Sequence, residues 1–233
     1  MTDSHDEQKQ LAAEHAVQFI ESNMVVGLGH GSTALFAVKI IADLLKNGTV
    51  QNIVAVPCSK YIEEEAEKLG IKLTTLHHHP QIDITIDGAD EVDPKLNLIK
   101  GYGGALLREK IVAQASNREI IIVDESKIVD VLGKKHPVPV EVIPFGWYSH
   151  MPFFNTIGAD ATLRMTSDHT PFITDQGNYI IDCRFNSLQD ISGIANKLSE
   201  RAGVVEHGLF INIATDVIAA TSTGIQHFRR EAI

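Results

Sequence analysis

The sequence predicts an α/β protein: a doubly wound, mostly parallel sheet of the Rossmann-like type, joined to a second, smaller α+β domain of the ferredoxin-like type. Helical and strand patterns take turns up to about residue 130, which is typical of a parallel sheet covered by helices. A glycine-rich turn joins the first strand to the helix that follows it, as in phosphate-binding α/β folds. After residue 132 the pattern changes to prolines and hairpin-like runs, which indicates the second domain.

The elements of the first domain follow from the spacing of apolar residues. Helices carry an apolar residue every three or four positions, whereas short buried strands are nearly continuous apolar runs. The predicted order is helix 10–20, strand 24–28, helix 33–48, strand 52–57, helix 60–70, strands 71–76 and 82–87, helix 105–116 and strand 119–124. The tail 209–221 is expected to return to this sheet. The first domain is therefore predicted to comprise residues 1–132 and 207–233.

The second domain is predicted to cover residues 133–206. Its first segment, 134–144 (KKHPVPVEVIP), combines prolines with the alternating apolar pattern of a strand. The segment 172–183 (FITDQGNYIIDC) is typical of a hairpin that turns at Gln176-Gly177. The segment 187–201 follows as a helix with Ser187 as its N-cap.

Composition and charge exclude several classes of protein. The 233 residues are 44% hydrophobic and 21% charged, as in ordinary globular proteins, and the net charge of −10 argues against nucleic acid or an anionic membrane as the main partner. There is no apolar stretch of membrane-spanning length and no signal-peptide pattern, so a cytoplasmic location is expected. Cys58 and Cys183 are far apart and are expected to be reduced packing residues.

The first chemical signal is the turn VVGLGHGSTA, which contains Gly27, Gly29 and Gly31 and leads into a helix at Ser32 and Thr33. Glycines allow close approach of a ligand, and a helix N-terminus favours an anion, so the turn predicts a phosphate site. NAD is disfavoured as the ligand, because the acid expected about 20 residues later is missing. Nucleoside triphosphate hydrolysis is poorly supported, because no Walker A lysine follows the turn. A tight strand-to-helix turn without a ligand is the alternative.

The second signal is the stretch 85–110, TIDGADEVDPKLNLIKGYGGALLREK. The strand before it would deliver Asp87 and Asp90 to its carboxyl end, where ligands bind in open α/β sheets. Lys100 precedes a glycine turn, and the helix after that turn carries Glu109. Acids beside a lysine and exposed amides are suited to moving protons on a sugar and stabilising the charge that develops. The alternative is an acidic, solvated loop.

Several ordered motifs carry a resemblance to a known family. GLGHGSTA, IDGADEVD, IKGYGGALLREK, VDESK and PVEVIPFGW resemble those of the type A ribose-5-phosphate isomerases, and the similarity runs from about residue 6 to 230. The resemblance implies interconversion of D-ribose 5-phosphate and D-ribulose 5-phosphate in the pentose phosphate pathway. It also implies that no metal or organic cofactor is needed, and that the protein is a homodimer or tetramer.

Matching the motifs residue by residue implies the roles in the site. Glu109 falls on the general base, and Asp87, Asp90 and Lys100 fall on the other catalytic groups. The implied substrate-binding residues are His30, Gly31, Ser32, Thr33, Asp87, Gly88, Ala89, Asp90, Lys100, Gly101, Tyr102, Gly103, Lys127 and Lys9. In two places the chain departs from the family pattern. His30 replaces a threonine of the first loop, and Tyr102 adds a ring that either covers the site or points into solvent.

Two other classes of function would need features of their own in the sequence. A sugar-phosphate-sensing regulatory domain of related fold would need a DNA-reading element, and the 24 residues before the first strand are too few and too acidic for one. A metal-dependent isomerase would need convergent ligands. Adjacent side chains in an extended segment point to opposite sides, so His77, His78 and His79 are expected to form an exposed loop before Pro80.

Overall fold

The computed structural model describes residues 4–186 and 188–230. The chain divides into two compact units. Unit 1 contains the described residues up to Ala89, Arg108–Ile128 and those from Asn212 on, whereas unit 2 contains Asp90–Leu107 and Val129–Ile211. The sequence-based division placed residues 90–107 with the first domain. They are grouped with unit 2 because two short strands within them pair with a third strand near residue 210.

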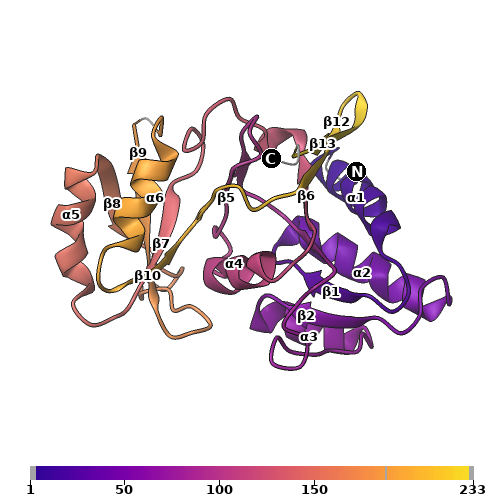
Figure 1. Ribbon diagram of the computed structural model, residues 1–233. Helices are drawn as coiled ribbons and strands as arrows, with labels where there is room; N and C mark the ends of the chain where they lie inside the picture. The colour runs from indigo at the N-terminus through magenta and orange to yellow at the C-terminus, as the bar shows by residue number, and fades with distance from the viewer. Residues whose placement is uncertain (1–3, 187, 231–233) are drawn as a thin grey trace. The chain divides into compact units, whose positions relative to one another are not determined.

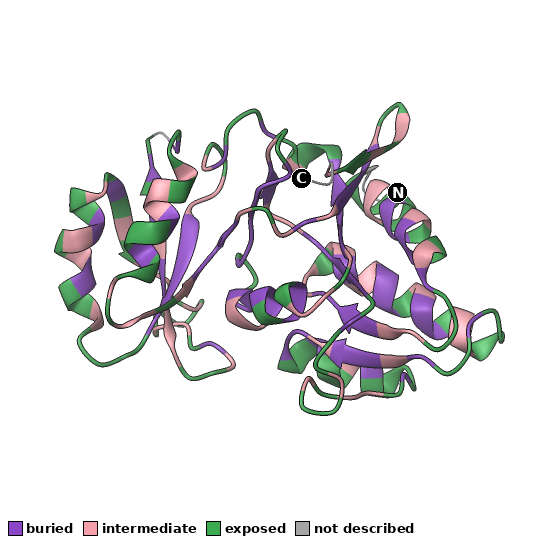
Figure 2. Ribbon diagram, in the orientation of Figure 1, coloured by how far each residue is buried: buried purple, intermediate pink, exposed green. Residues whose placement is uncertain are grey.

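Unit 1 is built on a six-stranded sheet with the order β13-β12-β6-β3-β1-β2. All neighbouring pairs are parallel except the edge pair of β12 and β13. The strands are β1 (Val25–Leu28), β2 (Val54–Pro57), β3 (Ile84–Asp87), β6 (Glu119–Asp124), β12 (Asp216–Thr221) and β13 (Gly224–Arg229). Every residue of β6 is buried, as expected for an inner strand covered on both faces (Figure 2). The predicted doubly wound sheet and the return of the tail as β12 are confirmed.

Helices cover the sheet of unit 1 (Figure 1). They pack against it through two separate apolar clusters. They are α1 (Ser4–Ala16), α2 (Ser32–Lys46), α3 (Lys60–Lys68) and α4 (Leu106–Gln114), with a 3-10 turn η1 (Val17–Phe19) after α1. The larger cluster contains Ala55 of β2 together with buried residues of α1, α2 and α3, whereas Val56 packs with Val112 of α4. Successive residues of a strand point to opposite faces, so the two clusters lie on opposite sides of the sheet.

The predicted strand 71–76 is wrong. Within this range only Leu73 makes a bridge, to Ala55 of β2, with Thr74 N donating to Ala55 O at 2.8 Å. The chain then turns, because the carbonyl of Thr75 accepts hydrogen bonds from the amides of residues 78 and 79. A carbonyl used in such a turn cannot continue a ladder with β2, so the run of β-favouring residues does not become a strand.

Unit 2 contains a four-stranded antiparallel sheet with the order β10-β7-β9-β8 and a three-stranded sheet with the order β11-β5-β4. Its strands are β4 (Glu91–Val92), β5 (Leu98–Ile99), β7 (Val138–Val142), β8 (Ala159–Leu163), β9 (Tyr179–Phe185), β10 (Val204–His207) and β11 (Leu209–Phe210). Its helices are α5 (His150–Thr156), which follows the 3-10 turn η3 (Trp147–Ser149), and α6 (Ile191–Ser199). The succession β7-α5-β8-β9-α6-β10 is that of a ferredoxin-like unit. The predicted small α+β domain is therefore confirmed.

Details of unit 2 differ from the sequence-based expectation. α5 and β8 were not predicted. The chain turns at Gln176-Gly177 as predicted, with Thr174 N donating to Asn178 O at 2.9 Å, but β9 pairs along its whole length with β7 and β8. The predicted cap Ser187 lies outside the described residues. The N-cap of α6 is Asp190, whose Oδ1 accepts a hydrogen bond from Gly193 N at 2.9 Å. No helix in the described part of the chain has the length and apolar character needed to cross a membrane.

Asp216, at the start of β12, is a buried acid held by a cluster of donors in unit 1. Arg118 donates to its two carboxylate oxygens at 3.0 and 2.8 Å, and His227 Nε2 lies 2.7 Å from Oδ1. Burial raises the pKa of this carboxyl, but hydrogen bonds from Arg118, Thr215 and His227 outweigh it and hold the pKa at about 2, against an ordinary value of 3.8.

We expect Asp216 to contribute about 2 kcal/mol to the free energy of unfolding at neutral pH. Because its pKa is lower in the folded chain, the contribution is complete above about pH 4 and is lost as the pH falls towards about 2. Urea unfolding of the wild type and Asp216→Asn measures this: the difference between them should shrink on acidification. Asp160→Asn, at an exposed site, is the control. A difference that stayed constant down to about pH 2.5 would contradict the expectation.

Candidate active site

The carboxyl ends of β1 and β3 lie side by side in unit 1, because the strands pair in parallel with Leu28 opposite Ile86. From β1 the chain crosses through α2 to β2 on one side, whereas the strand after β3 in this sheet, β6, lies on the other side. The connections diverge between β1 and β3, and open α/β sheets bind ligands at such a switch point. The turns that leave these two strand ends are those that the sequence predicted for the site.

The carboxylate of Asp87 joins the two turns. Its Oδ1 accepts hydrogen bonds from His30 N at 2.9 Å and from Gly88 N at 2.7 Å, and the residue is 1% exposed. A Cβ added at Gly29 would lie 2.3 Å from this oxygen and 2.4 Å from Asp87 Cα. Position 29 therefore requires glycine, because any side chain would push the turn off the aspartate.

Gly31 places the N-terminus of α2 at the end of the first turn. Its φ of 106° lies in the left-handed region that favours glycine, and the helix begins at Ser32 without a side-chain cap. The first amides of a helix have no intrahelical acceptor and carry the positive end of the helix dipole. Ser32, which is exposed, and Thr33 thus lie where a phosphate would be bound.

The ring of His30 is held by the connection between β2 and α3. Its Nδ1 lies 2.9 Å from Ser59 Oγ, and its edge meets the ring of Tyr61 at a centroid distance of 5.9 Å. Ser59 also caps α3 by accepting a hydrogen bond from Ile62 N at 3.1 Å. The histidine that replaces the usual threonine therefore links the first turn to a second connection. Sequence reasoning missed Ser59, although a serine before an apolar-periodic run is the signal of an N-cap.

Unit 1 also contains the predicted general base. Glu109 lies in the first turn of α4 and is only 4% exposed. Burial of a carboxylate is costly, so a group kept at such a position is a candidate for proton transfer. Its neighbour in sequence, Lys110, is equally buried at 4%.

The two predicted lysines of unit 1 lie on elements that meet at the carboxyl end of β6. Lys127 is half-buried in η2 (Glu125–Lys127), which follows β6 directly. Lys9 is in α1 and forms an ion pair with Asp6 at 2.9 Å. The residue before it, Gln8, donates a hydrogen bond to Glu125 at 3.0 Å, which docks α1 on η2. Both lysines are thus attached to the same edge of the sheet as the glycine turns.

The remaining predicted residues lie in unit 2. Asp90 Oδ2 accepts a hydrogen bond from Tyr102 N at 2.9 Å, and the amide of Asp90 donates to Ile99 O at 2.8 Å. Lys100 is 2% exposed, its amide donates to Gly208 O at 2.9 Å, and its Nζ lies 5.6 Å from the centroid of the Phe210 ring. Asp90 and Lys100 are therefore both fixed to the turn that begins at Gly101.

Tyr102 is 68% exposed, so its ring extends mainly into solvent within unit 2. Its edge meets the His136 ring at a centroid distance of 5.8 Å. The backbone of the turn is held by Arg164, whose Nη1 donates to the carbonyls of Gly101 and Tyr102 at 2.8 and 2.9 Å. Sequence reasoning missed Arg164, because no local pattern links it to a turn about 60 residues earlier.

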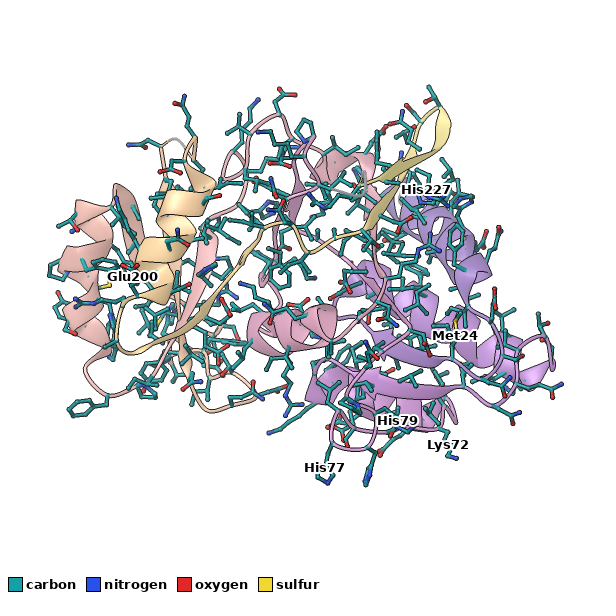
Figure 3. The ribbon with its side chains drawn as sticks, viewed as in Figure 1. Met24, Lys72, His77, His79, Glu200 and His227 are labelled. Atoms are coloured by element: carbon teal, nitrogen blue, oxygen red, sulfur yellow. The ribbon has the colours of Figure 1, made fainter. Side chains whose placement is uncertain are left out.

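His77, His78 and His79 lie in the turn that follows residues 71–76. His77 and His78 are exposed, and Nδ1 of His79 lies 2.8 Å from Thr74 Oγ1 (Figure 3). Within residues 4–186 and 188–230 there is no group of three or more His, Cys, Asp or Glu side chains arranged to hold a metal ion. Cys183 is fully buried, and burial raises the pKa of its thiol, so it lacks the properties of a reactive cysteine.

The chain matches one protein family over most of its length. The family model of ribose 5-phosphate isomerase A (phosphoriboisomerase A) matches residues 54–224. The ribose-5-phosphate isomerase A of Desulfatibacillum aliphaticivorans is 53% identical over 226 residues, which are 97% of this chain and 98% of the relative. The chain belongs to the ribose 5-phosphate isomerase A family. The isomerase A of Chloroflexus aurantiacus is 50% identical over 97% of this chain and 95% of its own length.

Solved structures of ribose 5-phosphate isomerases have the same fold as this family member. The structure from Plasmodium falciparum is 40% identical, with a TM-score of 0.94 over 97% of this chain and 100% of that chain. A structure of D-ribose-5-phosphate isomerase in complex with phospho-erythronic acid is 42% identical, with a TM-score of 0.95 over 97% of this chain and 99% of that one. The resemblance inferred from the motifs is thereby confirmed.

Proposed function

We propose that this chain interconverts D-ribose 5-phosphate and D-ribulose 5-phosphate by proton transfer through an enediolate. The observation that carries the proposal is that unit 1 contains both a phosphate-type turn, which ends at the N-terminus of α2, and the buried carboxylate of Glu109. The near full-length relatives named as ribose-5-phosphate isomerases support it. They do not favour the alternative of a sugar-phosphate-sensing regulatory domain.

Glu109 is the proposed base. It takes the proton from C2 of the aldose, and the electron pair of that bond forms the C1–C2 double bond of the enediolate while negative charge develops on O1. The same carboxyl then returns the proton to C1, which gives the ketose. The hydroxyl proton of O2 moves to O1, and Asp87 is the group proposed to shuttle it. One general base can serve both carbons, because they are neighbours.

The charge of the enediolate requires stabilising groups. For this role we propose Lys100 and the amides of Gly101 and Gly103, with Asp90 as a further substrate contact. These assignments rest on the matched motifs and on the hydrogen bonds from Arg164 and to Asp90 that hold the turn in unit 2 in place. A related isomerase was solved with phospho-erythronic acid, which combines a phosphate with a carboxylate, and this supports a site for two separated negative charges.

The phosphate is assigned to the turn His30–Thr33, with Lys127 and Lys9 as the proposed cationic partners; Gly88, Ala89 and Tyr102 complete the proposed substrate contacts. We also propose a homo-oligomer, a dimer or tetramer, in the cytoplasm. Support for an assembly comes from the exposed apolar side chains of Phe145 and Tyr148 in unit 2, which are 90% and 71% exposed. Light scattering of the purified chain measures the assembly directly.

The test of the proposed activity is direct. Purified protein is incubated with ribose 5-phosphate, with and without a chelator, and the ketose is assayed. We expect turnover that the chelator does not reduce. Absence of ketose formation would overturn the isomerase assignment, and loss of turnover in chelator would favour the metal-dependent alternative.

For the phosphate site, we expect Ser32→Ala and Lys127→Ala to raise KM about fivefold or more while changing kcat little, because phosphate contacts are made equally in the ground and transition states. Steady-state kinetics with ribose 5-phosphate measure both constants. Lys95→Ala, at an exposed site, is the control for Lys127→Ala. A large fall in kcat with an unchanged KM would contradict the assignment of these groups to the phosphate.

A further inference from the structure

The guanidinium of Arg164 binds the backbone of the turn that begins at Gly101, directly after Lys100. Arg164 comes directly after β8, and its side chain is 13% exposed. Its Nε donates to Asp182 Oδ2 at 2.9 Å and its Nη2 donates to Oδ1 of the same carboxylate. Its Nη1 donates to the carbonyls of Gly101 and Tyr102. A guanidinium has five N–H donors in a rigid plane, so these bonds leave it no freedom to turn.

These hydrogen bonds fix the direction of two successive peptide planes. The plane between Gly101 and Tyr102 is held from both sides, because Arg164 binds its carbonyl and Asp90 binds its N–H. The next plane has the Tyr102 carbonyl on Arg164 and the Gly103 N–H on its opposite edge. The C=O and N–H of a trans peptide point in opposite directions, so Arg164 determines where the Gly103 amide points.

The Gly103 amide is available for a ligand. Gly103 is exposed, and within the described part of the chain its N–H has no hydrogen-bond acceptor. The next residue is fixed as well: Gly104 has a φ of 84°, and a Cβ there would lie 2.4 Å from the Phe172 ring. Phe172 N in turn donates to Arg164 O at 2.9 Å. A donor held rigidly before substrate arrives is what stabilisation of a developing oxyanion requires.

We infer that Arg164, oriented by Asp182, is a positioning residue for the isomerisation, and that it aims the Gly103 amide at the enolate oxygen of the substrate. This inference rests on the proposed function. Arg164 itself touches only protein groups, so it acts through the turn. Its effect belongs to the transition state, where the oxygen carries more charge than in the sugar, and removing it therefore lowers kcat rather than raising KM.

The experiment compares Arg164→Lys and Arg164→Ala with the wild type. A lysine keeps the charge but cannot hold two carbonyls and a carboxylate at once. We expect kcat to fall at least about tenfold in Arg164→Lys and further in Arg164→Ala, with KM changed less than about threefold. Addition of millimolar methylguanidinium should restore part of the kcat of Arg164→Ala. Arg184→Lys, at an exposed position of the neighbouring strand β9, is the matched control and should keep wild-type kinetics.

A second readout separates positioning from folding. Binding of phospho-erythronic acid should weaken in Arg164→Lys in parallel with kcat/KM, while the thermal midpoint stays close to that of the wild type. An unchanged kcat overturns the inference, and so does a loss of activity that follows a loss of folded protein and is not rescued by methylguanidinium. If the wild type itself forms no ketose, it is the proposed function that fails. If the wild type is active and Arg164→Lys equals it, only the role of Arg164 fails.

Discussion

We expect replacement of Glu109 by glutamine to lower kcat by about a hundredfold or more without unfolding the protein. Glutamine has nearly the same shape as glutamate but cannot accept the C2 proton, and a positioned general base is worth about 10² to 10⁴ in rate. The measurement is steady-state turnover of ribose 5-phosphate, with circular dichroism to show that the fold is kept. Exchange of the C2 hydrogen with deuterated solvent provides a second measurement, because it reports proton abstraction without completed turnover.

Glu67→Gln is the control for this prediction, because it makes the same change at an exposed position of α3 in the same unit. It should leave kcat and KM unchanged. Turnover of Glu109→Gln within a few-fold of the wild type would show that another group removes the proton. Loss of folded protein would instead show that the buried carboxylate stabilises unit 1, and Glu109→Asp, which keeps the acid on a shorter side chain, would then test the chemistry alone.

Gly29→Ala is expected to have the next largest effect. The new methyl group would lie 2.4 Å from Asp87 Cα, which is backbone and cannot turn away, so the β1 turn must shift. Overpacking of this kind costs about 1–3 kcal/mol of stability. A displacement of about 1 Å in a catalytic site costs about a hundredfold in rate, so kcat/KM should fall by a similar factor. Thermal unfolding and steady-state kinetics measure the two effects.

Gly88→Ala serves as the stability control for Gly29→Ala. Its Cβ would lie no closer than 3.8 Å to any atom, the nearest being His30 O, and this is ordinary contact. The thermal midpoint should therefore change little. A midpoint of Gly29→Ala as high as that of Gly88→Ala, with unchanged kcat/KM, would show that the turn can move away from Asp87 at no cost.

Local sequence patterns correctly predicted those strands and helices that are specified by a few consecutive residues, such as an apolar run or a glycine turn. The predicted strand 119–124 coincides with β6, and the helix expected to begin at Ser32 begins there. In both, the local signal is sufficient: β6 is a continuous buried apolar run, and the glycine turn before α2 gives the backbone the conformation in which the helix can begin. The strand predicted at 71–76 failed for the converse reason: its apolar residues are in place, but a turn at Thr75 takes the carbonyl that a ladder would need.

The candidate site likewise combines groups that the sequence predicts with partners that only the structure identifies. The glycine turn, Asp87 and Glu109 are recognisable in the sequence, because each belongs to a short motif beside a strand or helix end. The partners that hold these groups are distant in sequence: Ser59 binds the ring of His30, and Arg164 binds the carbonyl of Tyr102 across a separation of 62 residues. Such partners leave no periodic or motif signal, so only the folded chain identifies them.

By itself the sequence determined the fold class and the family and supplied the candidate reactive groups, because these depend on the period of apolar residues and on motifs of a few consecutive positions. Only the tertiary structure decided which carbonyls, amides and carboxylates are paired, and hence which way the turn at Gly103 faces. The physical reason is that a hydrogen bond depends on distance and direction in space, and neither is encoded by separation along the chain.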